Sequence, residues 1–376
     1  MNPTTSRILV IGGGFSGMAA AIALRRRGFA VDLCEIDPGW RSYGAGISLG
    51  GATLRAFRQL GILDAFLAQG HAGDGVDILA PTGQKITTLP TPRLAGPDVP
   101  GGGGIMRPVL AKLMAEATRA SGTQVHLGCS FQEIVQDAEG VEVVFTDGRR
   151  QRYDAVIGSD GLYSKMRQHL FPEAPKPRYV GQAVWRAVLP RPAEVTNAMM
   201  WVGPKLKAGL NPVSGEAMYL FLTEDRPANE HIDPAQFAPR LRELLSTFPA
   251  PLLQQVREQI GPQSQIVFRP LESLLLPRPW HRGRVILIGD AVHATTPHLA
   301  SGACIGIEDA LVLAEELARA ENVPAALSAF ENRRWERCRM VVENSGRLCD
   351  LEIQGGDKAE HAQVMRESLM ALAQPI

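Results

Sequence analysis

The sequence is short of the features that mark several classes of protein. Lys and Arg together number 39, and Asp and Glu also number 39, so the formal net charge at pH 7 is zero. A balanced chain of this kind lacks the basic surface that binds nucleic acid or an anionic membrane. Only five cysteines occur among 376 residues, and none forms a CxxC pair. This argues against a disulfide framework and against a cysteine zinc site.

Long apolar runs and metal-binding patterns are also missing. No stretch reaches the ~18 apolar residues that a membrane span requires. The eight histidines show no HExxH-like spacing, so we expect no metal centre. Few residues precede the first apolar run, which predicts no signal peptide. Together these absences predict a cytoplasmic protein with free thiols, whose length suits two domains.

The most informative stretch runs from Ile8 to Glu35. An apolar run meets a glycine-rich turn, an apolar-periodic segment follows, and a second apolar run ends at Glu35. This order predicts strand, turn, helix and strand, which is the opening unit of a dinucleotide-binding sheet. In such a turn, glycines permit the tight bend and let the backbone approach a pyrophosphate, and the acid accepts hydrogen bonds from a ribose. The turn residues are Gly12, Gly14, Phe15, Ser16 and Gly17.

Two further turns follow predicted buried strands. Asp160-Gly161 comes after the strand at 154–159, and Gly289-Asp290 comes after the strand at 284–288. Ligands of open α/β sheets bind at the carboxyl ends of the strands, so we expect the three turns to converge on one long cofactor. The alternative is that both aspartates are ordinary turn residues.

The segment between these last two turns has a different character. Residues 176–278 are rich in predicted strands and contain two predicted helices, at 234–248 and 251–259. We interpret this segment as an inserted antiparallel sheet with one face turned towards a ligand. Earlier in the chain, the Pro- and Gly-rich stretch 90–104 predicts a loop. The expected domains are a dinucleotide-binding domain in 1–175 and 279–354, a substrate domain in 176–278, and a C-terminal tail in 355–376.

These motifs resemble the single-component FAD-dependent aromatic hydroxylases, the class A flavoprotein monooxygenases of the para-hydroxybenzoate hydroxylase fold. The resemblance extends to about Arg337 and is carried by the first turn with Glu35, by 154–167 (DAVIGSDGLYSKMR) and by 284–297 (RVILIGDAVHATTP). It implies an α/β fold with a Rossmann-like FAD domain, an inserted antiparallel β-sheet substrate domain and C-terminal helices. It also implies a monomer or homodimer that uses NAD(P)H and O2 to hydroxylate a small aromatic or heteroaromatic substrate through a C4a-hydroperoxyflavin.

The resemblance also assigns expected contacts with FAD. The first turn would hold the pyrophosphate, Arg107 would contact the flavin side, and Asp290 would bind the ribitol chain. The segment 297–303 would lie against the isoalloxazine ring. The full expected set is Gly12, Gly14, Phe15, Ser16, Gly17, Glu35, Arg41, Ala45, Arg107, Asp160, Gly161, Gly289, Asp290, Pro297, Gly302 and Ala303.

Contacts with the substrate are expected at three residues. Arg186 would suit a carboxylate, a phenolate or a ring carbonyl, although a surface or ion-paired role is the alternative. Tyr219 shares a strand face with Phe221 and would line the pocket or the core. His298 follows Pro297 and is the predicted catalytic residue, which would hydrogen-bond or deprotonate a phenol-like substrate. Its alternative is a structural role in the loop.

Three positions depart from the pattern of the family. Ala300-Ser301-Gly302 stands where Gly-Gln-Gly is usual, Ser159 replaces Ala, and Gly50-Gly51 replaces a Pro-Asn or Ser-Asn pair. Two other functions stay open. One is an oxygenase of the same fold on a non-phenolic substrate: an epoxidase, an antibiotic-modifying enzyme or a purine-type hydroxylase. The other is a non-catalytic flavin-binding protein, which only Ala300-Ser301 favours.

Overall fold

The computed structural model describes residues 6–376, and a six-stranded sheet forms the centre of its dinucleotide-binding half. Four of its strands come from the expected motifs and run parallel: β2 (Ala30–Glu35), β1 (Arg7–Ile11), β12 (Ala155–Gly158) and β19 (Val285–Leu287). The edges are β8 (Gln124–Leu127) and β18 (His281–Arg282). Parallel strands end on the same side of a sheet, so the three predicted turns emerge together.

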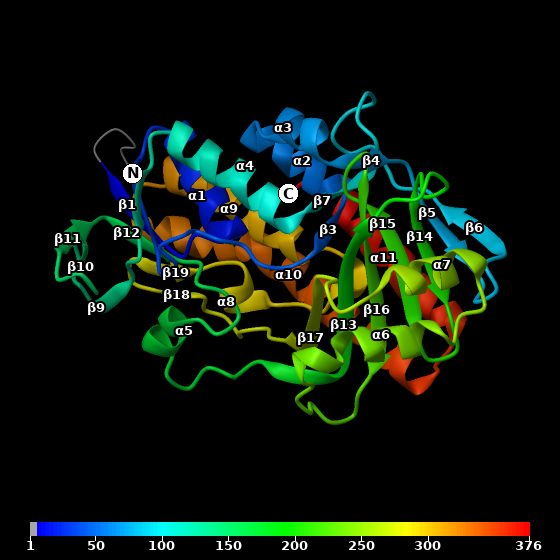
Figure 1. The fold of residues 1–376 in the computed structure, drawn as a ribbon. Coiled ribbons are helices and arrows are strands. Elements are labelled where there is room, and N and C mark those ends of the chain that lie inside the picture. The colour runs from blue at the N-terminus through cyan, green and yellow to red at the C-terminus, as the bar shows by residue number, and fades with distance from the viewer. Residues whose placement is uncertain (1–5) are drawn as a thin grey trace.

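Helices cover this sheet, and their sequences explain how closely they pack. Helix α1 (Phe15–Arg26) carries mostly alanines and aliphatic residues, and it packs against α9 (Gly302–Arg319), which packs in turn on α10 (Val323–Gln354). Figure 1 shows these helices beside the sheet, with α4 (Arg107–Ala120) lying across α1. The small side chains of α1 allow the helix and strand backbones to approach, and apolar burial between them stabilises this half. Shorter helices are α2 (Gly51–Leu60), α3 (Leu63–Gln69), α5 (Lys165–Leu170) and α8 (Asp290–His293).

Two three-stranded sheets complete the dinucleotide-binding half. One joins β11 (Arg150–Tyr153), β10 (Val141–Phe145) and β9 (Phe131–Gln136); the other joins β3 (Gly46–Gly50), β7 (Gly102–Met106) and β4 (His71–Gly73). Strand β7 begins inside the stretch 90–104, so the expectation of a loop there was wrong at its end. A Cβ on Gly103 would lie 2.4 Å from the His71 carbonyl oxygen. The glycines that suggest a loop therefore allow neighbouring backbones to pack closely.

The other half is a seven-stranded sheet. Its strands in order are β17 (Ile266–Ser273), β13 (Arg178–Pro190), β16 (Ala217–Asp225), β15 (Lys207–Pro212), β14 (Ala198–Val202), β5 (Val76–Leu79) and β6 (Lys85–Leu89). The substrate domain was expected to begin at residue 176. The seven-stranded sheet also includes β5 and β6, which precede that residue, and β5 runs parallel to β14. Because isolated short strands carry no signal of their partners, the sequence did not reveal this pairing.

The two faces of the seven-stranded sheet differ. Trp185, Leu220 and Leu222 belong to a core with α6 (Phe237–Leu245) and α7 (Pro251–Gln259), preceded by the short η1 (Pro234–Gln236). The opposite face carries Arg186 and Tyr219, since paired residues of antiparallel strands point the same way. Figure 1 shows this sheet beside the dinucleotide-binding half, with α6 and α7 on its outer side.

The expected C-terminal tail is a helix, α11 (Lys358–Ala373), which packs on the body of the protein. Arg337 of α10 donates to the Ala371 carbonyl oxygen at 2.8 Å, and Arg55 of α2 donates to that of Ala373 at 2.9 Å. No helix formed by residues 6–376 is long and apolar enough to cross a membrane.

Candidate FAD and substrate site

The three predicted turns meet at the ends of the parallel strands. Gly12 has φ +106°, and a Cβ there would lie 2.5 Å from the Ser159 carbonyl oxygen, so the first turn touches the second. A Cβ on Gly289 would lie 2.5 Å from Ser16 Oγ, which brings the third turn against the start of α1. Their convergence, expected from the order of motifs, is what the backbone shows.

The N-terminus of α1 is suited to a phosphate. Gly14 precedes the helix in extended conformation (φ −73°), no side chain caps it, and its first turn carries no acidic residue. A Cβ built on Gly14 would meet no atom within 4 Å. Free N–H groups with a partial positive charge therefore face open space. This open cradle fits the pyrophosphate of FAD.

Glu35 lies beside this cradle. Its carboxylate accepts hydrogen bonds from the backbone N–H groups of Gly13 at 2.7 Å and Asp37 at 2.8 Å. A carboxylate held in this way is oriented to accept hydrogen bonds from ribose hydroxyls. Trp40, which the sequence did not single out, donates from Nε1 to the Gly13 carbonyl oxygen at 2.8 Å. Arg41 is exposed and pairs with Asp37 at 2.9 Å, so its expected contact with FAD stays a prediction.

Asp160 and Ala45 have local roles in the described chain. The Asp160 carboxylate accepts hydrogen bonds from Ser164 Oγ at 2.5 Å and from the backbone N–H of Met166 at 2.9 Å. These bonds cap α5, as an ordinary turn residue would do. The Ala45 carbonyl oxygen accepts from the Arg107 N–H at 3.0 Å, which fixes the start of α4. Direct contacts of both residues with FAD stay predictions.

The surroundings of Asp290 and Arg107 lead us to infer an open space beside them, which we call the hollow. Asp290 is solvent-exposed, yet burial among protein atoms raises the pKa of its carboxyl, while His293 and Arg107 oppose this. A side chain can be exposed to solvent and still be surrounded by protein atoms where it faces a deep recess of the protein. The Arg107 guanidinium lies 5.1 Å from the centre of the Phe15 ring. A carboxylate and a cation this near one another suit a ligand with both hydroxyl and anionic groups.

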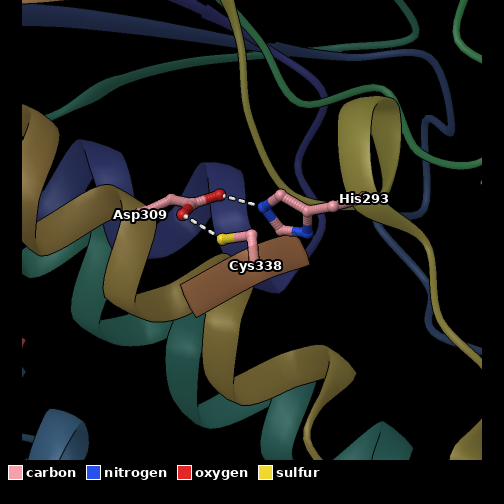
Figure 2. A group of neighbouring side chains, drawn as sticks. All are labelled: His293, Asp309 and Cys338. Atoms are coloured by element: carbon pink, nitrogen blue, oxygen red, sulfur yellow. Dashed lines mark hydrogen bonds and ion pairs between the residues drawn. The ribbon is translucent and has the colours of Figure 1, made fainter. Parts of the chain in front are cut away.

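A buried charge network supports the third turn. Figure 2 shows Asp309 of α9 between His293 and Cys338, with Nε2 of His293 2.5 Å from Asp309 Oδ2 and Cys338 Sγ 3.6 Å from Oδ1. Arg334 Nε donates to Asp309 Oδ1 at 2.8 Å, and the Gly289 N–H donates to Oδ2 at 3.0 Å. These residues have the spacing of metal ligands. However, the guanidinium already neutralises the carboxylate, so we assign a structural ion-pair network.

The ionisation of this network follows from its geometry. Burial alone would lower the pKa of His293, but the Asp309 carboxylate raises it well above the usual value. Burial alone would raise the pKa of Asp309, but the His293 and Arg334 cations hold it well below its usual range. The network is therefore ionised around neutral pH, and it fixes the Gly289 backbone next to Asp290.

The segment expected against the flavin ring is a tight turn. Residues 297–299 form η2 (Pro297–Leu299), Ala300 has φ +49°, and α9 begins at Gly302. Ser301 donates from Oγ to the Leu299 carbonyl oxygen at 2.7 Å and leaves the first N–H groups of α9 without a side-chain cap. Pro297, Gly302 and Ala303 are partly exposed. An uncapped helix end here would stabilise negative charge on a reduced acceptor.

Arg186 and Tyr219 share one face of the seven-stranded sheet and lie near Arg107, so we infer that they border the same hollow. Burial lowers the pKa of Arg186, and nearby Arg269 adds to this while Tyr219 opposes it. Tyr219 is 5% exposed, and its hydroxyl lies 2.6 Å from Ser48 Oγ. A Cβ on Gly46 would lie 2.1 Å from Tyr219 Cδ1, so this glycine lets β3 approach the ring. The Tyr219–Ser48 contact therefore joins the two halves, a role the sequence did not predict.

His298 is buried within the segment 297–303, which we call the flavin segment. Its Nδ1 lies 2.9 Å from Thr296 Oγ1, and its Nε2 lies 3.4 Å from Glu352 Oε2 of α10. Burial lowers the pKa of this imidazole, which the Glu352 carboxylate opposes. Both ring nitrogens thus face protein groups, and the expected contact with substrate stays a prediction. Glu352 was not singled out, because a glutamate in a long helix gives no signal of its tertiary partners.

Comparison with known proteins identifies the family. A model of the FAD binding domain family matches residues 5–345. The chain belongs to this family. It is 32% identical to the aurachin C monooxygenase/isomerase of Stigmatella aurantiaca, over 97% of the chain and 94% of that relative. It is 30% identical to the putative FAD-dependent monooxygenase YetM of Bacillus subtilis, over 94% of the chain and 95% of the relative.

A solved structure is similar over nearly the whole chain. Klebsiella pneumoniae HpxO, complexed with FAD and uric acid, superposes with a TM-score of 0.83 at 26% identity, covering 98% of each chain. The protein is thus a flavoprotein with the class A fold, and it is an FAD-dependent monooxygenase. These findings confirm the expected family, fold class, enzyme class and flavin cofactor. The residue-level assignments rest on the geometry described above.

Proposed function

We propose that this protein hydroxylates a small anionic heteroaromatic compound, with NAD(P)H as the reductant and O2 as the source of oxygen. The observation that carries the proposal is a pair of unpaired cations. Arg107 and Arg186 both border the hollow. Burial lowers the pKa of each guanidinium, and the charge of Arg186 lowers that of Arg107 further. Neither forms an ion pair with a carboxylate anywhere in residues 6–376. Two desolvated guanidinium groups so close together repel one another unless an anion lies between them.

The two arginines suit different partners. Arg107 lies next to Phe15 and feels the charge of Asp290, so it belongs to the FAD side of the hollow. Arg186 lies on β13, the second strand of the seven-stranded sheet, on the face that also carries Tyr219. A planar guanidinium there binds a carboxylate or an enolate through two hydrogen bonds and orients the ring in one plane.

When bound, FAD supplies the redox and oxygen-transfer chemistry. The side chains bind, orient and exclude water around it. Asp290 accepts hydrogen bonds from the ribitol, the uncapped start of α9 stabilises negative charge, and Arg186 fixes the substrate. The sheet of Tyr219 and Phe221 closes the space on the other side. This division explains why the reaction needs no nucleophile or metal ligand.

The remaining alternatives differ in how well they suit the site. The uric acid bound by HpxO favours a purine-type or other heterocyclic substrate over a neutral alkene. A non-catalytic flavin-binding role has no support in the hollow, because Arg186 would then be a desolvated cation without a partner. The cytoplasmic location and the monomeric or dimeric state stay predictions.

Steady-state kinetics of the FAD-loaded protein test this proposal. NADH and NADPH oxidation is measured with pairs of hydroxylated pyridines, quinolines and purines that differ only in an acidic group. The anionic member should stimulate oxidation and gain one oxygen. Arg186→Met should raise its KM by about 10–150-fold, the value of one or more lost charged hydrogen bonds, and leave FAD content unchanged. Arg178→Met, exposed on the same strand, is the control. A preference for neutral analogues would reject the proposal.

A further inference from the structure

Glu352 joins three parts of the molecule that are far apart in the sequence. Its Oε1 lies 2.6 Å from Nζ of Lys207 in β15 and 3.2 Å from Nε2 of His361 in α11. Its Oε2 faces His298 Nε2 at 3.4 Å. Burial alone would raise the pKa of Glu352, but Lys207 and the histidines hold it well below the usual range. A permanent anion therefore sits between the substrate sheet, the flavin segment and the C-terminal helices.

The two neighbours of His298 determine which nitrogen carries its proton. The side chain is 1% exposed, and its Nε2 faces the Glu352 carboxylate at 3.4 Å without another hydrogen-bond partner in the described chain. A carboxylate accepts hydrogen bonds only, whereas the Thr296 hydroxyl can donate. A neutral imidazole in this setting carries its proton on Nε2 and accepts at Nδ1 from Thr296. The Thr296 proton is then directed to His298 rather than to a ligand.

This group of residues adjoins the face of the sheet that carries Arg186. Lys207 lies two residues from Gly209, which pairs with Phe221, and Phe221 pairs with Arg186. Residues two apart on a strand share a face. On α10, Cys349 and Ile353 pack against Phe221. The end of α10 therefore lies over the same face as the proposed substrate contact, with Glu352 turned to the flavin segment.

We propose that Glu352 is a positioning residue for the hydroxylation: it holds His298 in the Nε2-protonated tautomer and so fixes Thr296 and the turn Pro297–Leu299 beside the substrate face. Glu352 touches neither FAD nor substrate in this role. It acts through His298, and Lys207 keeps its carboxylate in place from the substrate sheet. The effect on catalysis rests on the proposed function, whereas the effect on the tautomer does not.

Nitrogen-15 NMR of histidine-labelled protein tests the tautomer directly. In the FAD-loaded wild type, the His298 ring should show a protonated Nε2 and an unprotonated Nδ1, assigned by its absence in His298→Asn. Glu352→Gln, whose amide can donate to Nε2, should shift the ring towards the other tautomer. Glu352→Asp, which keeps the charge, should retain the wild-type pattern in part. Glu343→Gln, exposed on the same helix, is the control. A wild-type pattern in Glu352→Gln would overturn the proposal.

A double-mutant cycle tests the consequence for catalysis. Glu352→Gln should lower product formed per NAD(P)H consumed by about 10–100-fold, as expected of a displaced positioning group, with an unchanged FAD Kd. In a protein that already carries His298→Asn, Glu352→Gln should cause almost no further loss of product formed per NAD(P)H consumed. Full additivity of the two losses would contradict a role through His298.

Lys207→Met separates this role from a merely structural one. Glu352→Gln leaves Lys207 without its partner, which could lower stability and activity together. The double variant Glu352→Gln/Lys207→Met removes that unpaired charge, and it should recover stability but not coupling. Recovery of coupling as well would reject the positioning role. If no substrate is found, the NMR result still decides the tautomer, so failure of the proposed function is distinguishable.

Discussion

Replacing Gly14 with alanine separates the folding of the first turn from its ligand binding. Gly14 has φ −73° and ψ −177°, which any residue adopts, and its added Cβ would meet no atom within 4 Å. Alanine is a poorer helix cap than glycine, but it also restricts the unfolded chain, and each effect is about 0.4–1 kcal/mol. Because these effects oppose one another, the apoprotein should keep its stability within about 1 kcal/mol.

The holoprotein should respond differently, because the methyl group would occupy the space of the pyrophosphate. Losing one N–H hydrogen bond to a phosphate costs about 1.5–3 kcal/mol, which is about a 10–150-fold rise in Kd. Flavin fluorescence titration of the apoprotein measures that Kd, and urea unfolding measures the stability. Gly215→Ala, also with open space around its Cβ, should change neither. An unchanged Kd, or an apoprotein destabilised by several kcal/mol, would refute this reasoning.

Three other predictions follow from the same site. Asp290→Ala should raise the FAD Kd by about 10–150-fold through lost ribitol hydrogen bonds, without destabilising the apoprotein, because burial disfavours this carboxylate. Ala300→Gly should raise the free energy of unfolding by about 0.5–1 kcal/mol, because the φ of +49° at Ala300 strains an L-residue. A lower free energy of unfolding in the variant would contradict this. Asp309→Asn should lower the free energy of unfolding in urea by about 3–5 kcal/mol, because it removes the buried carboxylate that pairs with His293 and Arg334 and leaves Glu308 as the one acid paired with Arg334 among the described residues. The exposed control Glu343→Gln should leave that free energy unchanged.

The Asp309 variant should also change the pH dependence of stability. The pKa of His293 is raised in the folded protein by Asp309. A raised pKa contributes stability that is complete below the unfolded value and is lost as the pH rises through the folded value. In Asp309→Asn this contribution should disappear, so the stability difference between wild type and variant should be largest at mildly acidic to neutral pH. An equal difference up to strongly alkaline pH would contradict the ion pair.

The sequence pattern predicted those parts of the fold whose conformation depends on residues close together in the chain. The apolar run before Gly12, the glycine turn and Glu35 each have a signal within a few residues, and the structure has the expected strand, helix and strand there. Strand β7 and the pairing of β5 with β14 were missed, because backbone approach and register depend on distant residues. At the seven-stranded sheet, strand content was predictable but the partners of each strand were not.

Some residues of the site could be predicted from the sequence, whereas others have roles that only tertiary contacts reveal. Asp290 was singled out by its position after a predicted strand, and Arg107 by the resemblance to the family. The structure brings the two residues close together. Glu352 and Ser48 were missed, since their roles exist only through contacts with His298 and Tyr219. The departure at Ala300-Ser301 leaves the start of α9 uncapped and open. It therefore gives no reason to expect loss of the reaction.

The central claim is that the protein transfers one oxygen atom to an anionic heteroaromatic ring. The most direct measurement is mass spectrometry of the product formed under 18O2 by the FAD-loaded protein, with NAD(P)H and the most stimulating compound of the panel. The account predicts a product two mass units heavier than the one formed in 16O2, in near-stoichiometric yield with NAD(P)H consumed. A product that carries oxygen from water, or NAD(P)H oxidation that yields only hydrogen peroxide across the anionic members of the panel, would contradict it.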